Sequence, residues 1–223
     1  MDRRQGTDSR AVRVVGLRVA AMAGATRIGV LGGTFDPVHY GHLVAASEVG
    51  RVLGLDEVIF VPAGRPWQKA DQEIAPAEDR YLMTVLATLP DPLLTVSRVD
   101  IDRPGPSFSV DTLRDLRAER GELAEFYFIV GADTLRGLPT WKNPEQLVRM
   151  AHIVGCTRPG EGIDIAAAAA AGLASERYTL IEIPALEISS SDCRERVRTG
   201  RPLRYLVPDG VIQYIAKRGL YRE

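Results

Sequence analysis

The feature that most constrains this fold is an alternation, from Arg27 onward, of short apolar runs with longer amphipathic stretches. Residues 27–32 are β-branched and aliphatic, and apolar side chains then recur at helical spacing from Leu43 to Leu53. Strands that are separated by helices pair in parallel through right-handed crossovers. The sequence therefore predicts an α/β protein with a mostly parallel sheet.

Strands and helices are expected in regular order along the rest of the chain. The expected strands are residues 27–32, 57–61, 93–99, 125–130, 152–156 and 178–183. The expected helices after the first are residues 77–89 with Pro76 as a favourable first position, 109–120, 144–150 capped by Asn143, 164–171, 191–199 and 209–218. Ligands of such sheets bind beyond the carboxyl ends of the strands, which directs attention to the loops at Gly32, Pro62, Gly131 and Ile188.

Length and composition restrict the function classes. The 223 residues are 45% hydrophobic and 26% charged, as in ordinary globular proteins, and the net charge is −1. A chain so balanced lacks the global positive field that attracts duplex nucleic acid, so no nucleic-acid partner is expected. No apolar run reaches the roughly 20 residues that span a membrane, so no membrane partner is expected either. Cys156 and Cys193 lack metal-ligand spacing and suit a reducing compartment, which favours a cytoplasmic protein.

The first two dozen residues stand apart from this pattern. Residues 1–25 carry Arg3 and Arg4 near their start. The middle of this segment is weakly apolar, and Arg13 and Arg18 interrupt it. This is a poor secretory signal, and strong periodicity begins only at Arg27. We therefore expect a disordered extension over residues 1–25 and one domain over residues 26–223.

The richest cluster of polar residues follows the first strand, in the segment G-G-T-F-D-P-V-H-Y-G-H of residues 32–42. Paired glycines let a phosphate approach the backbone, and free N–H groups at a helix N-terminus favour its charge. His39 and His42 are three residues apart, so both rings lie over the first helical turn, where they can donate to phosphoryl oxygens. The pattern lacks the signatures of a dinucleotide-binding Rossmann site and of a P-loop.

Other interpretations of these histidines stay open. The pair could ligate a metal, although no third cysteine or histidine is nearby in the sequence. Either ring alone could serve in helix capping or packing.

A second cluster, I-S-S-S-D-C-R over residues 188–194, stands between a strand and a helix. The simplest interpretation is a serine-capped helix in which Asp192 and Glu195 form a pair resembling a capping box. Three hydroxyls, free amides and Arg194 also form a site for a polyphosphate.

These motifs together resemble a known family. The H-x-G-H and I-S-S-x-x-x-R patterns resemble signatures of the nucleotidyltransferase superfamily. Between them, P-S-F-S at 106–109 with D-T-L at 111–113, I-V-G-A-D at 129–133 and P-T-W at 139–141 resemble bacterial nicotinate-nucleotide adenylyltransferases. The resemblance covers residues 27–221 and implies a Rossmann-like, doubly wound sheet of the HUP type.

The resemblance also implies an activity and a division of roles. The family joins nicotinate mononucleotide to the adenylyl part of ATP in NAD biosynthesis, releasing pyrophosphate, with Mg²⁺ carried by the triphosphate rather than by protein ligands. His39 and His42 would be the catalytic residues. ATP would bind Gly32, Gly33, Thr34, Phe35, Gly131, Asp133, Ser190, Ser191 and Arg194. Nicotinate mononucleotide would bind Lys69, Ser109 and Trp141. A homo-oligomer is compatible with the resemblance.

The chain departs from the family pattern at a few positions. Serine stands at 109 and 191 where threonine is common, and Cys193 replaces an aliphatic residue. The segment P-W-Q-K at 66–69 replaces the more usual P-P-H-K, so the histidine of that loop is absent.

Three rival identities have specific sequence features against them. A pantetheine-phosphate adenylyltransferase is shorter and does not explain Trp141, and a class I aminoacyl-tRNA synthetase is longer and has a lysine-rich second signature. A non-catalytic nucleotide-binding module on the same fold is the alternative from another functional class, and the presence of both histidines, Asp133 and Arg194 argues against it.

Overall fold

One sheet organises the molecule, as a computed structural model shows for residues 14–15, 24–69, 71–157, 177–184 and 186–222. Its strands are β1 (Val14–Val15), β2 (Arg27–Gly33), β3 (Glu57–Pro62), β4 (Leu94–Val96), β5 (Glu125–Gly131), β6 (Ala151–Thr157) and β7 (Tyr178–Glu182). They lie in the order β1-β7-β6-β5-β2-β3-β4, and every pair except β1 with β7 is parallel. The predicted α/β fold with a mostly parallel sheet is confirmed.

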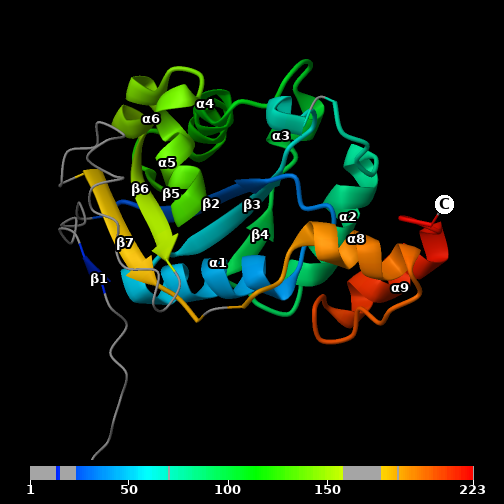
Figure 1. Cartoon of the computed structure of the whole chain (residues 1–223). Coiled ribbons are helices and arrows are strands. Elements are labelled where there is room, and N and C mark those ends of the chain that lie inside the picture. The colour runs from blue at the N-terminus through cyan, green and yellow to red at the C-terminus, as the bar shows by residue number, and fades with distance from the viewer. Residues whose placement is uncertain (1–13, 16–23, 70, 158–176, 185, 223) are drawn as a thin grey trace, which may run out of the picture.

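Helices cover both faces of the sheet (Figure 1). They are α1 (Tyr40–Leu53), α2 (Ala77–Thr88), α3 (Val99–Asp102), α4 (Ser109–Arg120), α5 (Ala132–Gly137), α6 (Pro144–Met150), α8 (Ser190–Arg198) and α9 (Asp209–Arg218), with 3₁₀ turns η1 (Trp67–Lys69) and η2 (Leu138–Thr140). Figure 1 shows α4, α5 and α6 on one face and α1, α8 and α9 on the other, which is the doubly wound arrangement.

The period-two alternation of each strand explains the two layers of core. In β2, Ile28 and Val30 pack in the cluster that contains Leu113 of α4, whereas Leu31 belongs to the cluster that contains Val49 of α1. Val58 of β3 joins the second cluster, and its neighbour Ile59 joins the first. Strands that are buried on both faces read as the continuous apolar runs seen in the sequence.

The strand order reverses at β2, which lies between β3 and β5. The chain therefore leaves β2 toward one edge of the sheet, and it builds β5, β6 and β7 toward the other. Connections on the two sides diverge at this point, which opens a crevice beyond the carboxyl ends of β2 and β5. Gly33 and Gly131 are the last residues of these two strands.

Several expected elements need correction. The strand predicted over residues 93–99 ends at Val96, because Val99 begins the short helix α3. Pro76 is the N-cap of α2 rather than its first residue, and α2 ends at Thr88. Helix α5 follows β5 directly and had no counterpart in the prediction. Helix α1 begins at Tyr40, three residues before the apolar repeat that starts at Leu43. The other predicted strands and helices in the described part of the chain lie within two residues of their predicted bounds.

The N-terminal region also differs from expectation in one place. Val14 and Val15 pair with Ile181 and Leu180 of β7, so two residues of the predicted disordered extension form an edge strand. Residues 1–13 and 16–23 lie outside the described part of the chain, as does the helix predicted over residues 164–171.

Candidate active site

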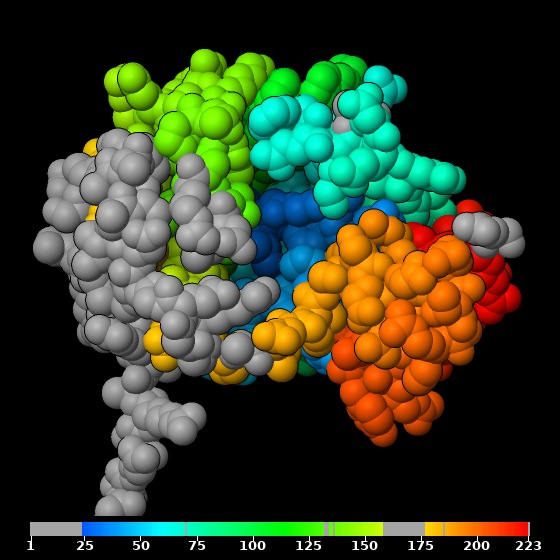
Figure 2. Space-filling model, viewed as in Figure 1, coloured from blue at the N-terminus to red at the C-terminus, as the bar shows by residue number. Residues whose placement is uncertain are grey.

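A cavity of about 590 Å³ opens at the reversal of the sheet, beyond the carboxyl ends of β2 and β5. Figure 2 shows it as a hollow between the segments that carry α5 and α6, the segment around residues 63–75 and helix α8. Residues from all four predicted loops line the cavity, among them Gly32, Ala63, Gly131 and Ile188. The cavity therefore lies where the sequence predicts the ligand site.

The turn from β2 into α1 forms the floor of this cavity. Gly32, Gly33 and Thr34 line it, and Phe35 does not. The Phe35 ring is buried behind the turn, where its edge meets the His42 ring at 5.0 Å between centroids. A Cβ on Gly33 would lie 2.8 Å from the Phe35 ring, so only glycine allows this turn. Phe35, which is predicted to bind ATP, thus lies outside the cavity lining and contacts the His42 ring.

His39 and His42 both line the cavity from the N-terminus of α1. Their rings are stacked, with 3.7 Å between centroids and 23° between planes. The backbone N–H of His39 donates to Nδ1 of His42 over 3.2 Å. A neutral imidazole that accepts at Nδ1 carries its proton on Nε2, so the His42 ring has a donor left for a ligand.

Burial keeps both rings uncharged near neutral pH. It lowers the pKa of His39 from 6.5 to about 4. Burial, followed by repulsion from His39 and Lys69, also lowers the pKa of His42 well below its usual value. Two neutral imidazoles can stack closely and still donate N–H groups to phosphate oxygens, which two imidazolium ions could not do without strong repulsion.

Gly41, the glycine of the H-x-G-H pattern, makes room for the pair. A Cβ at this position would lie 3.0 Å from Nδ1 of His39 and 3.1 Å from its Cε1. A larger residue would make the His39 ring shift by a few tenths of an ångström. Glycine between the histidines therefore leaves room for the observed ring position.

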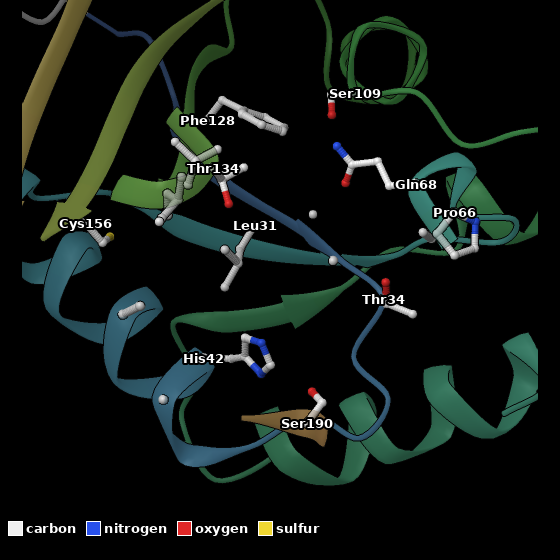
Figure 3. A pocket seen from close by; sticks show the side chains of 18 of the residues that line it. Leu31, Thr34, His42, Pro66, Gln68, Ser109, Phe128, Thr134, Cys156 and Ser190 are labelled. Atoms are coloured by element: carbon white, nitrogen blue, oxygen red, sulfur yellow. The ribbon is translucent and has the colours of Figure 1, made fainter. Parts of the chain in front are cut away.

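The N-terminus of α8 forms the wall of the cavity nearest to His42 (Figure 3). Ser189 is the N-cap, and its hydroxyl accepts the N–H of Asp192 over 3.1 Å. The Ser190 hydroxyl donates to the carbonyl of Pro37 over 2.9 Å, which ties α8 to the histidine turn. Ser190 and Ser191 both line the cavity, as predicted for hydroxyls that bind phosphate.

The predicted pair of Asp192 with Glu195 does not form a capping box. Asp192 accepts from Arg196 over 2.6 Å, and Glu195 pairs with Arg198 over 2.6 Å. Both acidic side chains therefore form ion pairs along the helix, while the cap itself is supplied by Ser189.

Arg194 lies beside the cavity rather than in its wall. Its guanidinium donates to the backbone carbonyl of Asp36 over 2.8 Å and to the Ser191 hydroxyl over 3.3 Å. It lines a second hollow of about 520 Å³ that shares Ser191 with the first. Arg194, which is predicted to bind ATP, therefore adjoins the cavity through Ser191, the residue that lines both hollows.

The opposite end of the cavity gathers the residues predicted for the acceptor. Lys69, Ser109 and Trp141 all line it. The Trp141 ring lies edge-on to Phe128 at 6.1 Å between centroids, which fixes its plane beside β5. Burial lowers the pKa of Lys69, and Arg194 lowers it further, whereas Asp36 raises it.

Ser109 is the first residue of α4, and Phe108 occupies the N-cap position without a side-chain hydrogen bond to the helix. Ser109 therefore stands inside the first turn of the helix rather than at its N-cap. The hydroxyl of Ser109 and the first-turn N–H groups lie at the positive end of a twelve-residue helix. Figure 3 shows the Ser109 hydroxyl and the Gln68 amide together at this end of the cavity.

Gly131 lines the cavity as the N-cap of α5. Asp133 follows it in α5, but its side chain lies outside what the structure describes. Thr134, one residue further along, does line the cavity.

Sequence reasoning missed Lys142, which lines the cavity directly after Trp141. Its ammonium donates to Asp111 over 2.9 Å and lies 4.5 Å from the centre of the Phe108 ring. A positive charge next to a predicted stacking residue is a signal in the sequence, but its role follows only from the contacts of Lys142 with Asp111 and Phe108 in the folded protein. Gln68 and Phe108 were also missed as lining residues.

The described residues contain no group of three or more histidine, cysteine, aspartate or glutamate side chains that could hold a metal ion. In the same part of the chain, no helix has the length and apolar character to cross a membrane.

Comparison with known proteins agrees with this geometry. Residues 30–196 match the family described as cytidylyltransferase-like. A probable nicotinate-nucleotide adenylyltransferase of Acidothermus cellulolyticus is 61% identical over 200 residues, covering 88% of this chain and 94% of that protein. Its counterpart from Salinispora arenicola is 57% identical over 193 residues, covering 86% of this chain and 100% of that protein.

A solved structure shares the fold at low identity. Nicotinic acid mononucleotide adenylyltransferase of Plasmodium falciparum, complexed with NaAD, superposes with a TM-score of 0.73 at 21% identity, covering 88% of this chain and 97% of that one. The relatives from Acidothermus and Salinispora are more than 50% identical to this chain over at least 86% of its length, and this similarity decides the assignment. The chain belongs to the cytidylyltransferase-like family and, within it, to the nicotinate-nucleotide adenylyltransferases.

Proposed function

We propose that this chain transfers the adenylyl group of ATP to nicotinate mononucleotide, forming nicotinate adenine dinucleotide and releasing pyrophosphate. The observation that carries the proposal is one cavity with two chemically different ends. The stacked histidines, the glycine turn and the α8 hydroxyls form an end suited to phosphates. Trp141, Ser109 and Lys142 form an end suited to a flat ring with a carboxylate.

The reaction needs no protein nucleophile. A phosphate oxygen of the mononucleotide attacks the α-phosphorus of ATP, and a new P–O bond forms. The bond from the α-phosphorus to the oxygen that links it to the β-phosphorus breaks, and that oxygen leaves with pyrophosphate. The nucleophile is already an anion, and the leaving group departs as one, so no general base is required. Catalysis therefore rests on alignment and on stabilisation of the charge that develops on the transferred group.

His42 has the geometry for this stabilisation. Because its Nδ1 is occupied by the backbone N–H of His39, its Nε2–H can donate to an oxygen of the α-phosphoryl group. His39, stacked on it, is assigned a second contact to the phosphates. Gly32, Gly33 and Thr34 would approach the same phosphates through the backbone, because glycine lets a phosphate come close to the main chain.

The other predicted site residues are assigned to ATP or to the acceptor according to the end of the cavity near which they lie. Ser190, Ser191 and Arg194 are assigned to the β- and γ-phosphates, and Gly131 with Asp133 to the ATP ribose. Lys69 is assigned to the acceptor phosphate, Trp141 to stacking on the pyridine ring, and Ser109 to its carboxylate. Lys142 adds a positive charge beside that carboxylate.

Mg²⁺ fits this arrangement as an ion that enters with ATP. The one acidic side chain among the described lining residues, Asp100, is buried and engaged by Thr112 over 2.6 Å and by Arg103. The hydroxyls, the amide and the imidazole N–H groups of the cavity are hydrogen-bond donors, and they suit phosphate oxygens. When bound to the triphosphate, Mg²⁺ would neutralise charge on the leaving pyrophosphate.

Pyrophosphate release tests the proposal. The purified protein is mixed with ATP and Mg²⁺, with and without nicotinate mononucleotide, and pyrophosphate is measured over time. Release that depends on the mononucleotide and is lost in His42→Ala supports the proposed function. No release above the protein-free control, in a protein that binds ATP, would identify a binding module instead.

A further inference from the structure

Asp36 is the centre of a buried polar cluster beneath the phosphate end of the cavity. Its side chain has an exposed fraction of 0%. Its Oδ1 accepts the hydroxyl of Tyr221 over 2.7 Å and the N–H of Ala75 over 3.3 Å. Within the described residues its Oδ2 accepts no hydrogen bond. A buried carboxylate with an unsatisfied oxygen strongly attracts any cation within reach.

The charge of Asp36 acts on Arg80 and Lys69, and the cation that the structure pairs with Oδ2 is Arg194. Its Nη1 donates to the backbone carbonyl of Asp36 over 2.8 Å, and the same nitrogen lies 3.7 Å from Oδ2. Its Nη2 lies on the other side, 3.3 Å from the hydroxyl of Ser191 in the cavity wall. The guanidinium thus stands between the buried carboxylate and the cavity.

Tyr221 reaches Asp36 from the C-terminal end of the chain. Helix α9 ends at Arg218, and the chain then passes Gly219 and places the Tyr221 ring against the histidine turn, 185 residues away in sequence. Burial and the charge of Asp36 raise the pKa of the Tyr221 hydroxyl, so it stays protonated and acts as the donor. The Tyr221 hydroxyl supplies a hydrogen bond to the Asp36 carboxylate, so the carboxylate attracts the Arg194 guanidinium less strongly.

We infer that Tyr221 is a positioning residue for the triphosphate site: by donating to Asp36, it keeps Arg194 available to ATP. This inference rests on the proposed role of Arg194. Without the tyrosine hydroxyl, the only remaining hydrogen bond to the Asp36 carboxylate among the described residues comes from Ala75. The carboxylate then draws the guanidinium away from the Ser191 hydroxyl, and ATP loses a partner.

Tyr214 provides a matched control. Its hydroxyl donates to the buried carboxylate of Asp79 over the same distance, 2.7 Å, and it ties α9 to α2. Tyr214→Phe removes the same group from the same C-terminal region, but Asp79 also pairs with Arg218 and not with Arg194. Both variants should lower the melting temperature, and only one should affect ATP.

The experiment compares Tyr221→Phe, Tyr214→Phe, Arg194→Ala and the double variant Tyr221→Phe/Arg194→Ala. Steady-state pyrophosphate release gives KM for ATP and for the acceptor, and calorimetric titration with Mg-ATP gives Kd without turnover. We expect Tyr221→Phe to raise KM and Kd for ATP about tenfold, the scale of losing one charged hydrogen bond. KM for the acceptor should stay within about twofold, as should every constant of Tyr214→Phe.

The double variant distinguishes an effect of Tyr221 that acts through Arg194 from a general contribution of Tyr221 to the stability of the fold. If Tyr221 acts through Arg194, removing its hydroxyl from the Arg194→Ala protein should change Kd for ATP by less than about twofold. The inference is overturned if Tyr221→Phe and Tyr214→Phe have equal kinetic constants, or if the two substitutions at 221 and 194 are additive. If the unsubstituted protein binds ATP without turnover, the proposed function fails, while the Kd series still decides the role of Tyr221.

Discussion

The ring of His42 is stacked on that of His39 at 3.7 Å between centroids, and its Nδ1 accepts the backbone N–H of His39. This relationship fixes three properties of His42 together: the ring plane, the tautomer and the neutral state. The H-x-G-H pattern therefore specifies a preorganised neutral donor rather than a positive charge.

Removal of either imidazole should reduce turnover. His42→Ala should lower kcat by about 10²-fold or more, the scale of losing one preorganised donor, and His39→Ala should behave similarly. His152→Ala is a matched control, because His152 of β6 is partly buried but does not line the cavity. Its ring contacts Thr179 of β7 and Tyr127 of β5. Near-normal kcat in the two folded site variants would refute their catalytic assignment.

The histidines should stay neutral far below their usual titration range. Burial lowers the pKa of His39 and His152 to about 4, and it also lowers that of His42. In the unfolded chain these groups take up protons below about pH 6.5, so the unfolded state binds more protons than the folded state. The free energy of unfolding should therefore fall as pH drops from 6.5 toward 4.

Nuclear magnetic resonance of the imidazole groups checks this directly, since the chain has only three histidines. No ring should titrate between pH 7.5 and about 5.5 in the folded protein. A histidine of the pair that titrates near 6.5 would contradict the neutral, stacked arrangement.

Substitution of Gly41 tests the packing argument for the motif. Its new Cβ in Gly41→Ala would lie 3.0 Å from the His39 ring, so the ring must shift by a few tenths of an ångström. We expect kcat to fall about tenfold or more because alignment at the phosphate is lost. Gly137→Ala is the control, since its Cβ would meet no atom within 4 Å. Equal kcat in the two variants would show that the histidine pair tolerates displacement.

Selectivity for nicotinate over nicotinamide mononucleotide should depend on Ser109 and Lys142. When nicotinamide mononucleotide binds, its NH₂ group faces donors of the pocket and leaves them unpaired. Each unpaired donor costs about 1–3 kcal/mol, so one or two of them predict a preference of roughly 10- to 10⁴-fold for the nicotinate form. Ser109→Ala should reduce the ratio of the two kcat/KM values. Lys142→Gln should reduce it by only a few-fold, because this side chain is 43% exposed and its charge is screened.

Two control variants accompany this series. Lys217→Gln, on the exposed end of α9, should leave the ratio unchanged. Trp141→Ala should weaken both acceptors alike, because its face stacks on either ring. A ratio that none of the substitutions alters would place the carboxylate elsewhere in the cavity.

The fold was largely predictable because its strands are buried on both faces. Continuous apolar runs located β2, β3, β5 and β6 within two residues, and the helix over residues 109–120 matches α4. The sheet order was not predicted at all, because it depends on contacts between distant segments. The same reason explains β1, whose two valines pair with β7, a strand much later in the chain.

Short polar helices were missed because they carry no apolar period. Helix α3 has four residues and is fixed by side chains: Ser97 accepts the N–H of Val99, and Arg98 pairs with Asp102. Helix α5 has six residues, too few to show a helical repeat.

The site was predictable where roles attach to motifs and unpredictable where they depend on packing. The histidine turn, the α8 serines and Trp141 come together in one cavity as expected. The burial of Phe35, the orientation of Arg194 toward Asp36 and the place of Lys142 follow from contacts across the fold.

The most direct test of the central claim follows the α-phosphorus of ATP. The protein is incubated with Mg²⁺, nicotinate mononucleotide and ATP labelled at this atom, and the products are separated and identified. We predict that the label appears in nicotinate adenine dinucleotide in a one-to-one ratio with pyrophosphate, and that His42→Ala largely abolishes this transfer. Label that stays in ATP, or that appears only as AMP, would contradict adenylyl transfer to this acceptor.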